Sequence, residues 1–367
     1  MTSSNRRHIH LCLVLVALLF GGIVEVGHVQ APPTFAARVA QLSEPGGYFD
    51  TDNLISNERS YLHVVPALRD ASLRGGAYVG VGPDQNFSYI AQVRPSIAFI
   101  VDLRRDNLLL HLLFKAMFAM SNTRAEYLSL LFGRPVPLPV QTWRNADLDK
   151  IVEHLEGVRL PEPDLADLRA RVDARIKSFG VALSDADFVT INRFHRRFIT
   201  AGLPLKFQTT GRTPQSYYPT YRELLLETDR QGRRASFLAE EADFQFVRSL
   251  QQRDLVIPVV GDLAGPTALT EIGRVMESRG DRLSAFYASN VEFYLFADGR
   301  FPVFVQNLAR LPHADHSLII RSVFGGLGQS APGYYSSSLV QPVDELLRGY
   351  AEGRFRGYAE LTVARSR

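Results

Sequence analysis

The chain has 367 residues, of which 46% are hydrophobic and 22% are charged, a composition typical of a globular protein. The net charge of +3 is small for this length, so the sequence predicts no nucleic-acid partner. The single cysteine, Cys12, lies in an N-terminal apolar run. The remaining chain therefore cannot form disulfides, cysteine nucleophiles or zinc–thiolate sites.

The N-terminal segment has the pattern of an export signal. Arg6 and Arg7 precede the uncharged run LCLVLVALLFGGIV, which indicates a signal peptide within residues 1–31. Because Pro32 follows the small-residue exit VQA and disfavours cleavage, an uncleaved inner-membrane anchor over residues 11–29 is the alternative. In either case the positive-inside rule predicts an exported domain, periplasmic or secreted, over residues 32–367. We expect membrane contact only through the N-terminal segment.

Apolar runs of strand length alternate with helical patterns along most of the domain. The first such pair is a strand at 76–82 and a helix from 83, and the second is a strand at 96–102 and a helix at 106–120. Residues 121–250 are mainly helical in pattern and predict an insertion that caps one edge of the sheet. Later strands are predicted at 254–262, 282–290 and 316–324, and the glycine- and serine-rich stretch 325–338 is predicted to be a loop. The order predicts an α/β, Rossmann-like, mostly parallel sheet flanked by helices, with a large helical insertion after the second strand.

The ends of the predicted strands carry the residues from which a ligand site is expected. In open α/β sheets, ligands bind beyond the carboxyl ends of the strands. Gly80 and Gly82 allow a tight turn and a close approach of the backbone to a ligand. Asp102 follows Gly82 by 20 residues, at the tip of the next strand, where a carboxylate accepts hydrogen bonds from two ribose hydroxyls. This pairing predicts a nucleoside-type site, although the glycine pair by itself is more typical of a simple turn.

Asp84 narrows the choice of cofactor. In a dinucleotide-binding fold a glycine stands at this position, close to the pyrophosphate. A carboxylate there repels phosphate and attracts an ammonium group, so the sequence argues against NAD, FAD and a P-loop. S-adenosylmethionine, which has a ribose and an amino group but no phosphate, fits better. The cofactor set predicted on this basis comprises Gly80, Gly82, Pro83, Asp84, Gln85, Asp102 and Asp262.

The motifs YVGVGPDQ and FIVD resemble the first two motifs of class I S-adenosylmethionine-dependent methyltransferases. VIPVVGDLAG and AFYASNVEFYLF look like the fourth- and fifth-strand region of that fold. Together with GYFDTDNLISNE, they resemble an uncharacterised, partly exported, methyltransferase-like bacterial family over about residues 45–330. The chain departs from the general pattern in two ways: no acid precedes the first glycine, and Asp84 replaces the third.

Two functions follow from this resemblance. The first is methyl transfer by in-line attack on S-adenosylmethionine, with Asn290 or Tyr287 orienting an acceptor that the sequence does not identify. The alternative for SNVEFY is a helix cap with aromatic residues in the core. The second function is an exported, non-catalytic or repurposed module that binds a small molecule or a protein, because S-adenosylmethionine is a cytoplasmic metabolite. Residues 51–58 lie where this fold often carries a lid, although helix capping explains their polar groups equally simply.

Overall fold

The structure is a computed structural model that describes residues 33–325 and 331–363. The predicted signal or anchor, 1–31, lies outside the described residues. Thr34–Arg367 form one compact unit. In the part of the chain that the structure describes, no helix combines the length and the apolar character that crossing a membrane requires.

A six-stranded sheet in the order β3-β2-β1-β4-β5-β6 forms the centre of this unit. All neighbours are parallel except β5 and β6, which are antiparallel. The strands are β1 (Ala77–Val81), β2 (Ile97–Asp102), β3 (Val256–Val260), β4 (Leu283–Ser289), β5 (His313–Phe324) and β6 (Ser336–Pro342). The predicted Rossmann-like fold is confirmed. The stretches that resemble a fourth- and fifth-strand region are β3 and β4, the third and fourth strands, so that assignment was wrong by one strand.

The loop predicted at 325–338 ends earlier than expected, because its last three residues, the serines 336–338, begin β6. These serines are not among the β-branched and aromatic residues that are enriched in strands. Their side chains are only 3% exposed, and the hydroxyls of Ser336 and Ser338 lie 3.0 and 3.2 Å from the hydroxyl of Ser60. The strand is thus stabilised by buried hydrogen bonds rather than by apolar periodicity.

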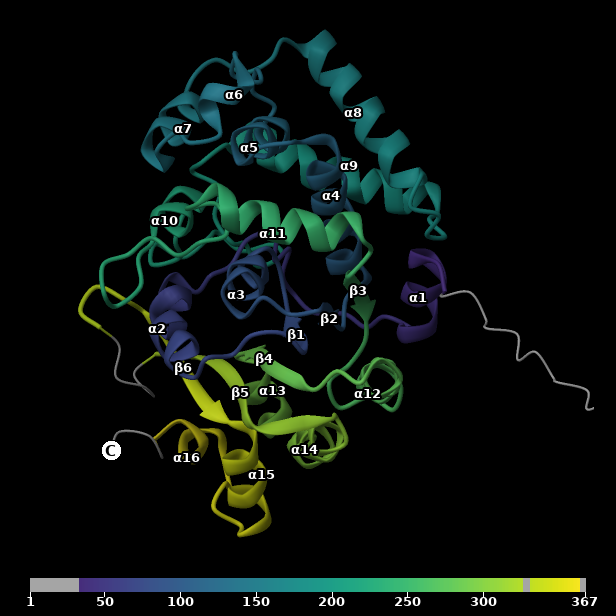
Figure 1. Ribbon diagram of the computed structural model, residues 1–367, viewed down its shortest axis with the longest axis vertical. Coiled ribbons are helices and arrows are strands. Elements are labelled where there is room, and N and C mark those ends of the chain that lie inside the picture. The colour runs from purple at the N-terminus through teal and green to yellow at the C-terminus, as the bar shows by residue number, and fades with distance from the viewer. Residues whose placement is uncertain (1–32, 326–330, 364–367) are drawn as a thin grey trace, which may run out of the picture. The chain divides into compact units, whose positions relative to one another are not determined.

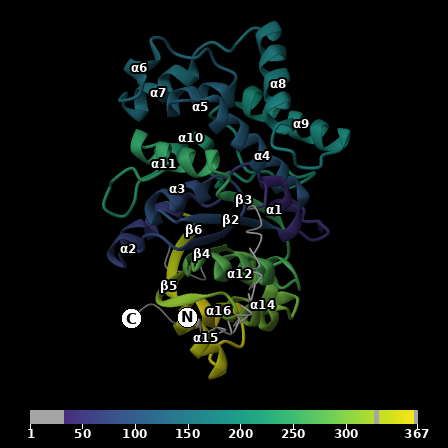
Figure 2. The same ribbon diagram turned by 45° about the vertical axis from the view of Figure 1, so that its right-hand side comes forward.

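Helices cover both faces of the sheet (Figures 1 and 2). One face carries α3 (Gln85–Val93), α4 (Arg105–Met120) and α11 (Glu241–Gln252). The other carries α12 (Ala268–Arg279), α14 (Phe301–Ala309) and α15 (Val343–Ala351), and α1 (Phe35–Leu42) packs on β3 and α12. Strands β1 and β3 are buried along their whole length, which explains their continuous apolar sequences.

The helical insertion follows β2, as predicted, and Tyr221 of its last helix reaches Asp84 at the carboxyl edge of the sheet. The insertion helices α8 (Glu162–Lys177) and α9 (Asp185–Ala201) pack mainly on α4, and α5 (Arg124–Phe132) packs on α9, so most of the insertion lies one layer away from the sheet (Figure 1). A capping box formed by Ser184 and Asp187 begins α9. The insertion also comprises α6 (Val140–Trp143), α7 (Leu148–Glu156) and α10 (Tyr221–Leu226).

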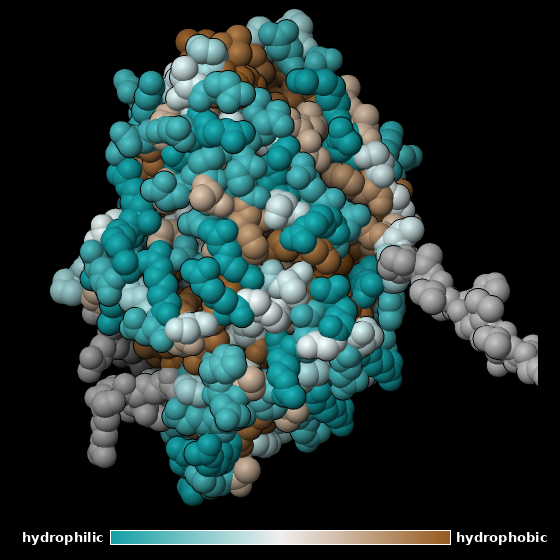
Figure 3. Space-filling model, viewed as in Figure 1, coloured by the Kyte–Doolittle hydropathy of each residue, from teal (hydrophilic) through white to brown (hydrophobic). Residues whose placement is uncertain are grey.

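The remaining elements are short. They are the 3-10 helix η1 (Arg59–Val64), α2 (Val65–Asp70), α13 (Val291–Ala297) and α16 (Tyr358–Val363). On the face shown in Figure 3, hydrophilic residues dominate and hydrophobic ones are scattered between them. Ligands of open α/β sheets bind beyond the carboxyl ends of the strands, where the strand order reverses. In this sheet the order reverses between β1 and β4, so the site is expected there.

Candidate functional site

The glycine turn after β1 is filled by the protein's own side chains. A Cβ on Gly80 would lie 2.0 Å from Oδ1 of Asn86 and 2.7 Å from the hydroxyl of Tyr78. The amide of Asn86 donates to the carbonyls of Val81 and Pro83, at 2.8 and 2.7 Å. Gly80 is thus required by the packing of Asn86 and Tyr78. Gly82 has a φ of 82°, which explains a glycine at the end of the strand.

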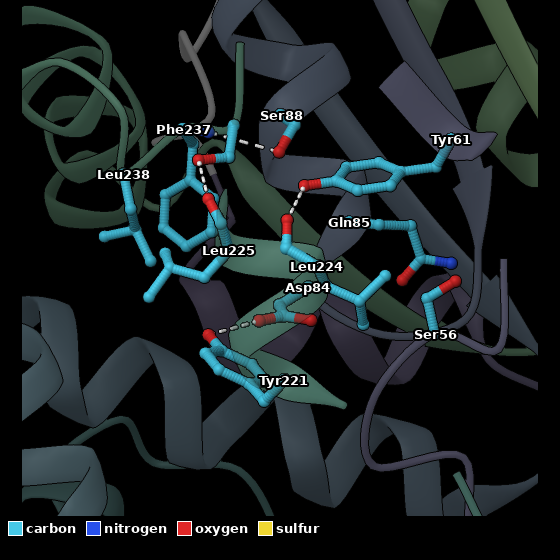
Figure 4. Close-up of a pocket in the computed structure, with 11 residues that line it drawn as sticks. Ser56, Tyr61, Asp84, Gln85, Ser88, Tyr221, Leu224, Leu225, Phe237 and Leu238 are labelled. Atoms are coloured by element: carbon cyan, nitrogen blue, oxygen red, sulfur yellow. Dashed lines mark hydrogen bonds between the residues drawn. The ribbon is translucent and has the colours of Figure 1, made fainter. Parts of the chain in front are cut away.

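Asp84 lies at the start of α3 and is buried there (Figure 4). Its Oδ2 accepts a hydrogen bond of 2.8 Å from the hydroxyl of Tyr221 in α10. Burial raises the pKa of Asp84 to about 6, and the bond from Tyr221 opposes this rise. The adjoining cavity of about 20 Å³ has room for about one water molecule. The space expected for an ammonium group is therefore largely occupied by Tyr221 and its neighbours.

Gln85 also faces this small cavity (Figure 4). Its Nε2 donates to the hydroxyl of Tyr287, at 3.1 Å, and its buried Oε1 has no hydrogen-bond partner among the described residues. Because an unpaired buried acceptor is costly, one buried water molecule is the simplest occupant.

The acids at the ends of β2 and β3 are paired as well. Both carboxylate oxygens of Asp102 accept from the guanidinium of Arg104, at 3.1 and 2.9 Å. Asp262 pairs with Arg300, and its Oδ1 accepts from the backbone of Ala264 at 2.8 Å. A ribose at Asp102 would have to displace the Arg104 guanidinium.

A segment before the first strand, residues 43–58, crosses the carboxyl ends of the strands, and we call it the N-terminal strap. Near its start, Glu44 donates its backbone N–H to Val260, at 2.9 Å. Gly47 donates to the carbonyl of Leu103 at 2.8 Å, and further on Thr51 accepts from Arg104 at 2.8 Å. The strap thus contacts the ends of β3 and β2 in turn. The lid proposed for residues 51–58 corresponds to its second half.

The strap ends in a buried cluster of a carboxyl group and the hydroxyl groups that bind it, which we call the Glu58 cluster. The carboxyl of Glu58 accepts hydrogen bonds from the hydroxyls of Tyr287, Ser289 and Ser322, which lie on β4 and β5. Burial raises the pKa of Glu58, whereas the three hydroxyl donors lower it. Ser289 has a φ of 52°, uncommon for a residue other than glycine. Tyr287, predicted to orient a substrate, is fully buried and binds Glu58 instead.

An open pocket lies beside this cluster, beyond the ends of β4 and β5. It has a volume of about 290 Å³, and Asn290, the other predicted substrate residue, lines it. Ring-bearing side chains make up most of its wall, and we call it the aromatic pocket. Its lining consists of Asn57, Tyr217, Tyr218, Asn290, Phe293, Tyr294, Phe324, Gly325, Tyr335 and Tyr358. Apolar walls with a few polar groups are typical of small-ligand sites.

Comparison with known proteins identifies the family but no activity. The family model described as "Domain of unknown function (DUF7790)" matches residues 53–134 and 195–351, about two thirds of the chain. The chain belongs to the DUF7790 family. No curated protein matches it. The DUF7790 match includes the strands β1 to β6, the second part of the strap and most of the aromatic pocket. It omits residues 135–194, which hold α6, α7 and α8.

Several residues of the DUF7790 site were not predicted from the sequence. Arg104 follows Asp102 by two positions in the sequence, and this spacing indicates that the carboxylate has an ion-pair partner. Tyr221 and Tyr217 lie in the helical insertion, and Tyr335 lies in the predicted loop, so no motif connects them. No group of three or more histidine, cysteine or acidic residues suited to a metal ion occurs in residues 33–325 and 331–363.

Proposed function

We propose that this DUF7790 protein is a small-molecule-binding module that uses a Rossmann-like sheet without the cofactor chemistry of a methyltransferase. One observation carries the proposal: at the same edge of the sheet, the nucleoside positions are taken by the protein itself while the aromatic pocket is open. Arg104 holds Asp102, and Tyr221 holds Asp84. Ligands of α/β sheets bind at this edge, so the open half is the better candidate.

The predicted export of the chain supports the same proposal. An exported protein is separated from S-adenosylmethionine, which is made and kept in the cytoplasm. A pocket that recognises a ligand by its shape and by contact with aromatic rings needs no cytoplasmic cofactor.

A neutral dye tests whether the pocket accepts organic molecules. Nile red added to the purified full-length protein is expected to bind and to shift its emission to shorter wavelength. The double variant Tyr294→Ser/Tyr335→Ser removes two rings of the lining, and we expect it to lose most of this signal. Val158→Ser is the matched control, because Val158 is 86% exposed and does not line the pocket. No dye binding, or equal binding by the double variant and the wild type, contradicts the proposal.

An S-adenosylmethionine-dependent methyltransferase is the second candidate, favoured by the strand order and by the position of the glycine turn. In that function Asp102 would hold the ribose, Asp84 the amino group, and Asn290 the methyl acceptor, with positioning as the main catalytic contribution. Arg104 would first have to leave Asp102. Calorimetry with S-adenosylmethionine and S-adenosylhomocysteine decides: heat that Asp102→Ala abolishes favours the enzyme, and no heat at millimolar ligand removes it.

A further inference from the structure

The aromatic pocket exposes an unusual concentration of ring surface. Among the described residues, six aromatic side chains are at least 38% exposed, and four of them line the pocket: Tyr217, Phe293, Tyr294 and Tyr335. A fifth, Phe49 of the strap, lies 4.9 Å from Tyr294 between ring centroids. Exposed rings gathered in one place mark an interaction site rather than chance.

The rings support one another without closing the pocket. Tyr217 and Tyr335 are stacked, with centroids 3.8 Å apart and planes at 23°. Phe293 and Tyr294 meet edge to face at 5.3 Å. Because each of these four side chains remains 38–46% exposed, ring surface stays available to a ligand.

In the part of the chain that the structure describes, no basic side chain, whether Lys, Arg or His, lines the aromatic pocket. Arg212, which lies close enough to influence Tyr294, is paired with Asp50 at 2.7 Å. The aromatic pocket therefore lacks the basic groove with which proteins bind single-stranded nucleic acid.

The charges beneath the pocket do not oppose a cation. Arg321 is fully buried and bound by Glu292, at 2.6 and 3.1 Å, so its charge is compensated. Glu58 adds a carboxyl whose described hydrogen-bond partners are all uncharged. Burial raises the pKa of Tyr358, a lining residue, and Glu292 and Glu58 raise it further, while Arg321 lowers it. Acidic groups thus outnumber basic ones around this ring.

We infer that the aromatic pocket recognises an organic cation, specifically a trimethylammonium group, on the faces of its tyrosine and phenylalanine rings. The inference rests on the proposed binding function. The electron-rich faces of aromatic rings attract cations, and quaternary ammonium ligands are recognised in this way. The described lining offers the amides of Asn57 and Asn290 and five tyrosine hydroxyls as neutral acceptors, but no carboxylate. A primary ammonium group, with three N–H donors, would therefore lack a charged partner among the described residues, whereas a trimethylammonium group has no N–H donors to satisfy.

Choline and its neutral carbon isostere, in which a tert-butyl group replaces the trimethylammonium group, give the direct test. The two molecules have nearly the same shape, so a difference in affinity reports the charge. Calorimetry on the full-length protein is expected to show choline binding about tenfold more tightly, within the range of a desolvated cation–π contact. Equal affinities overturn the inference, as does no choline binding by protein that binds Nile red. Loss of Nile red binding instead points to failure of the proposed function itself.

Single variants test whether the tyrosine rings of the aromatic pocket cause the preference for choline over its isostere. Tyr294→Leu and Tyr335→Leu are each expected to weaken choline binding about fivefold and to leave the isostere within about twofold. Tyr48→Leu is the control, because this side chain is 77% exposed and does not line the pocket. Melting temperatures confirm that each variant is folded. Unchanged choline affinity in both pocket variants overturns the inference.

Phosphocholine distinguishes the two sources of such a group, a soluble compound and a lipid headgroup. Since no basic side chain among the described residues lines the pocket, phosphate gains no partner there, and we expect choline to bind more tightly. Tighter phosphocholine binding would support the same trimethylammonium recognition and assign it to a headgroup.

Discussion

The two halves of the sheet's carboxyl edge differ in what covers them. At β1 to β3, side chains of the protein fill the glycine turn and bind Asp84, Asp102 and Asp262. Backbone hydrogen bonds and the side chain of Arg104 hold the strap in place. At β4 and β5, the strap ends in the buried Glu58 cluster, and beyond it the surface opens into the aromatic pocket. We call these the closed half and the open half.

This difference shows that a cofactor-like sequence motif and an open ligand-binding pocket can occur at different places on the same sheet edge. The closed half has the glycines and the acid that resemble a cofactor site, but their partners lie within the chain. The open half has no recognisable motif, yet it has the volume, the ring surface and the polar amides that a ligand needs. Four comparisons between variants test this contrast.

The largest effect is expected beneath the open half. Arg321→Met leaves the Glu292 carboxylate buried without its partner, which typically costs about 3–5 kcal/mol. Urea denaturation measures the loss. The double variant Arg321→Met/Glu292→Leu removes both charges and is expected to recover most of it. A double variant as unstable as the single one would show that packing, not charge, dominates.

The closed half is expected to show a pH-dependent penalty at Asp84. Its pKa rises from 3.8 to about 6 on folding, so the native state binds the proton more tightly than the unfolded state. Stability from this group is full below pH 3.8 and is lost as the pH rises to about 6. Asp84→Asn, which still accepts from Tyr221, should gain up to about 3 kcal/mol over the wild type at neutral pH. Denaturation at pH values below and above this window measures the gain, and a difference that does not change with pH would contradict the assignment.

A smaller effect is expected at the glycine turn. Gly80→Ala places a methyl group against Asn86 and Tyr78 and should cost about 1–3 kcal/mol by overpacking. Gly357→Ala is the matched control, since a Cβ there meets no atom within 4 Å. Thermal denaturation of both variants without ligand gives the comparison. If Gly80→Ala is as stable as the control, the turn is not filled in the way described.

The smallest effect on stability is expected in the open half. Tyr217→Leu loses a stacked ring at the surface and should change the free energy of unfolding by about 1 kcal/mol or less. Tyr287→Phe, its buried counterpart, loses the hydroxyl that donates to Glu58 and should cost about 1–3 kcal/mol. The reverse order would mean that the rings of the open half serve stability rather than binding.

The sequence predicted most of the fold because apolar runs such as 96–102 report directly on burial. It failed at β6, whose serines are held by hydroxyl contacts with Ser60 that no periodicity reveals. At the site, Gly80 and Asp102 lie at strand ends as expected. The space beside Gly80 is filled by Asn86, and the carboxylate of Asp102 is bound by Arg104, and the motif includes neither residue. The aromatic pocket joins Tyr217, Tyr294 and Tyr335, which lie far apart in the sequence, and only the fold brings them together.

The location of a bound cation tests the central claim most directly. Tetramethylarsonium has the shape and charge of a tetramethylammonium ion, and its arsenic atom gives an anomalous X-ray signal. In crystals of the protein soaked with this ion, we predict an arsenic peak in the aromatic pocket, within about 6 Å of the ring centres of Tyr294 and Tyr335. A peak beside Gly82 and Asp84, or no peak in the pocket, would contradict the account.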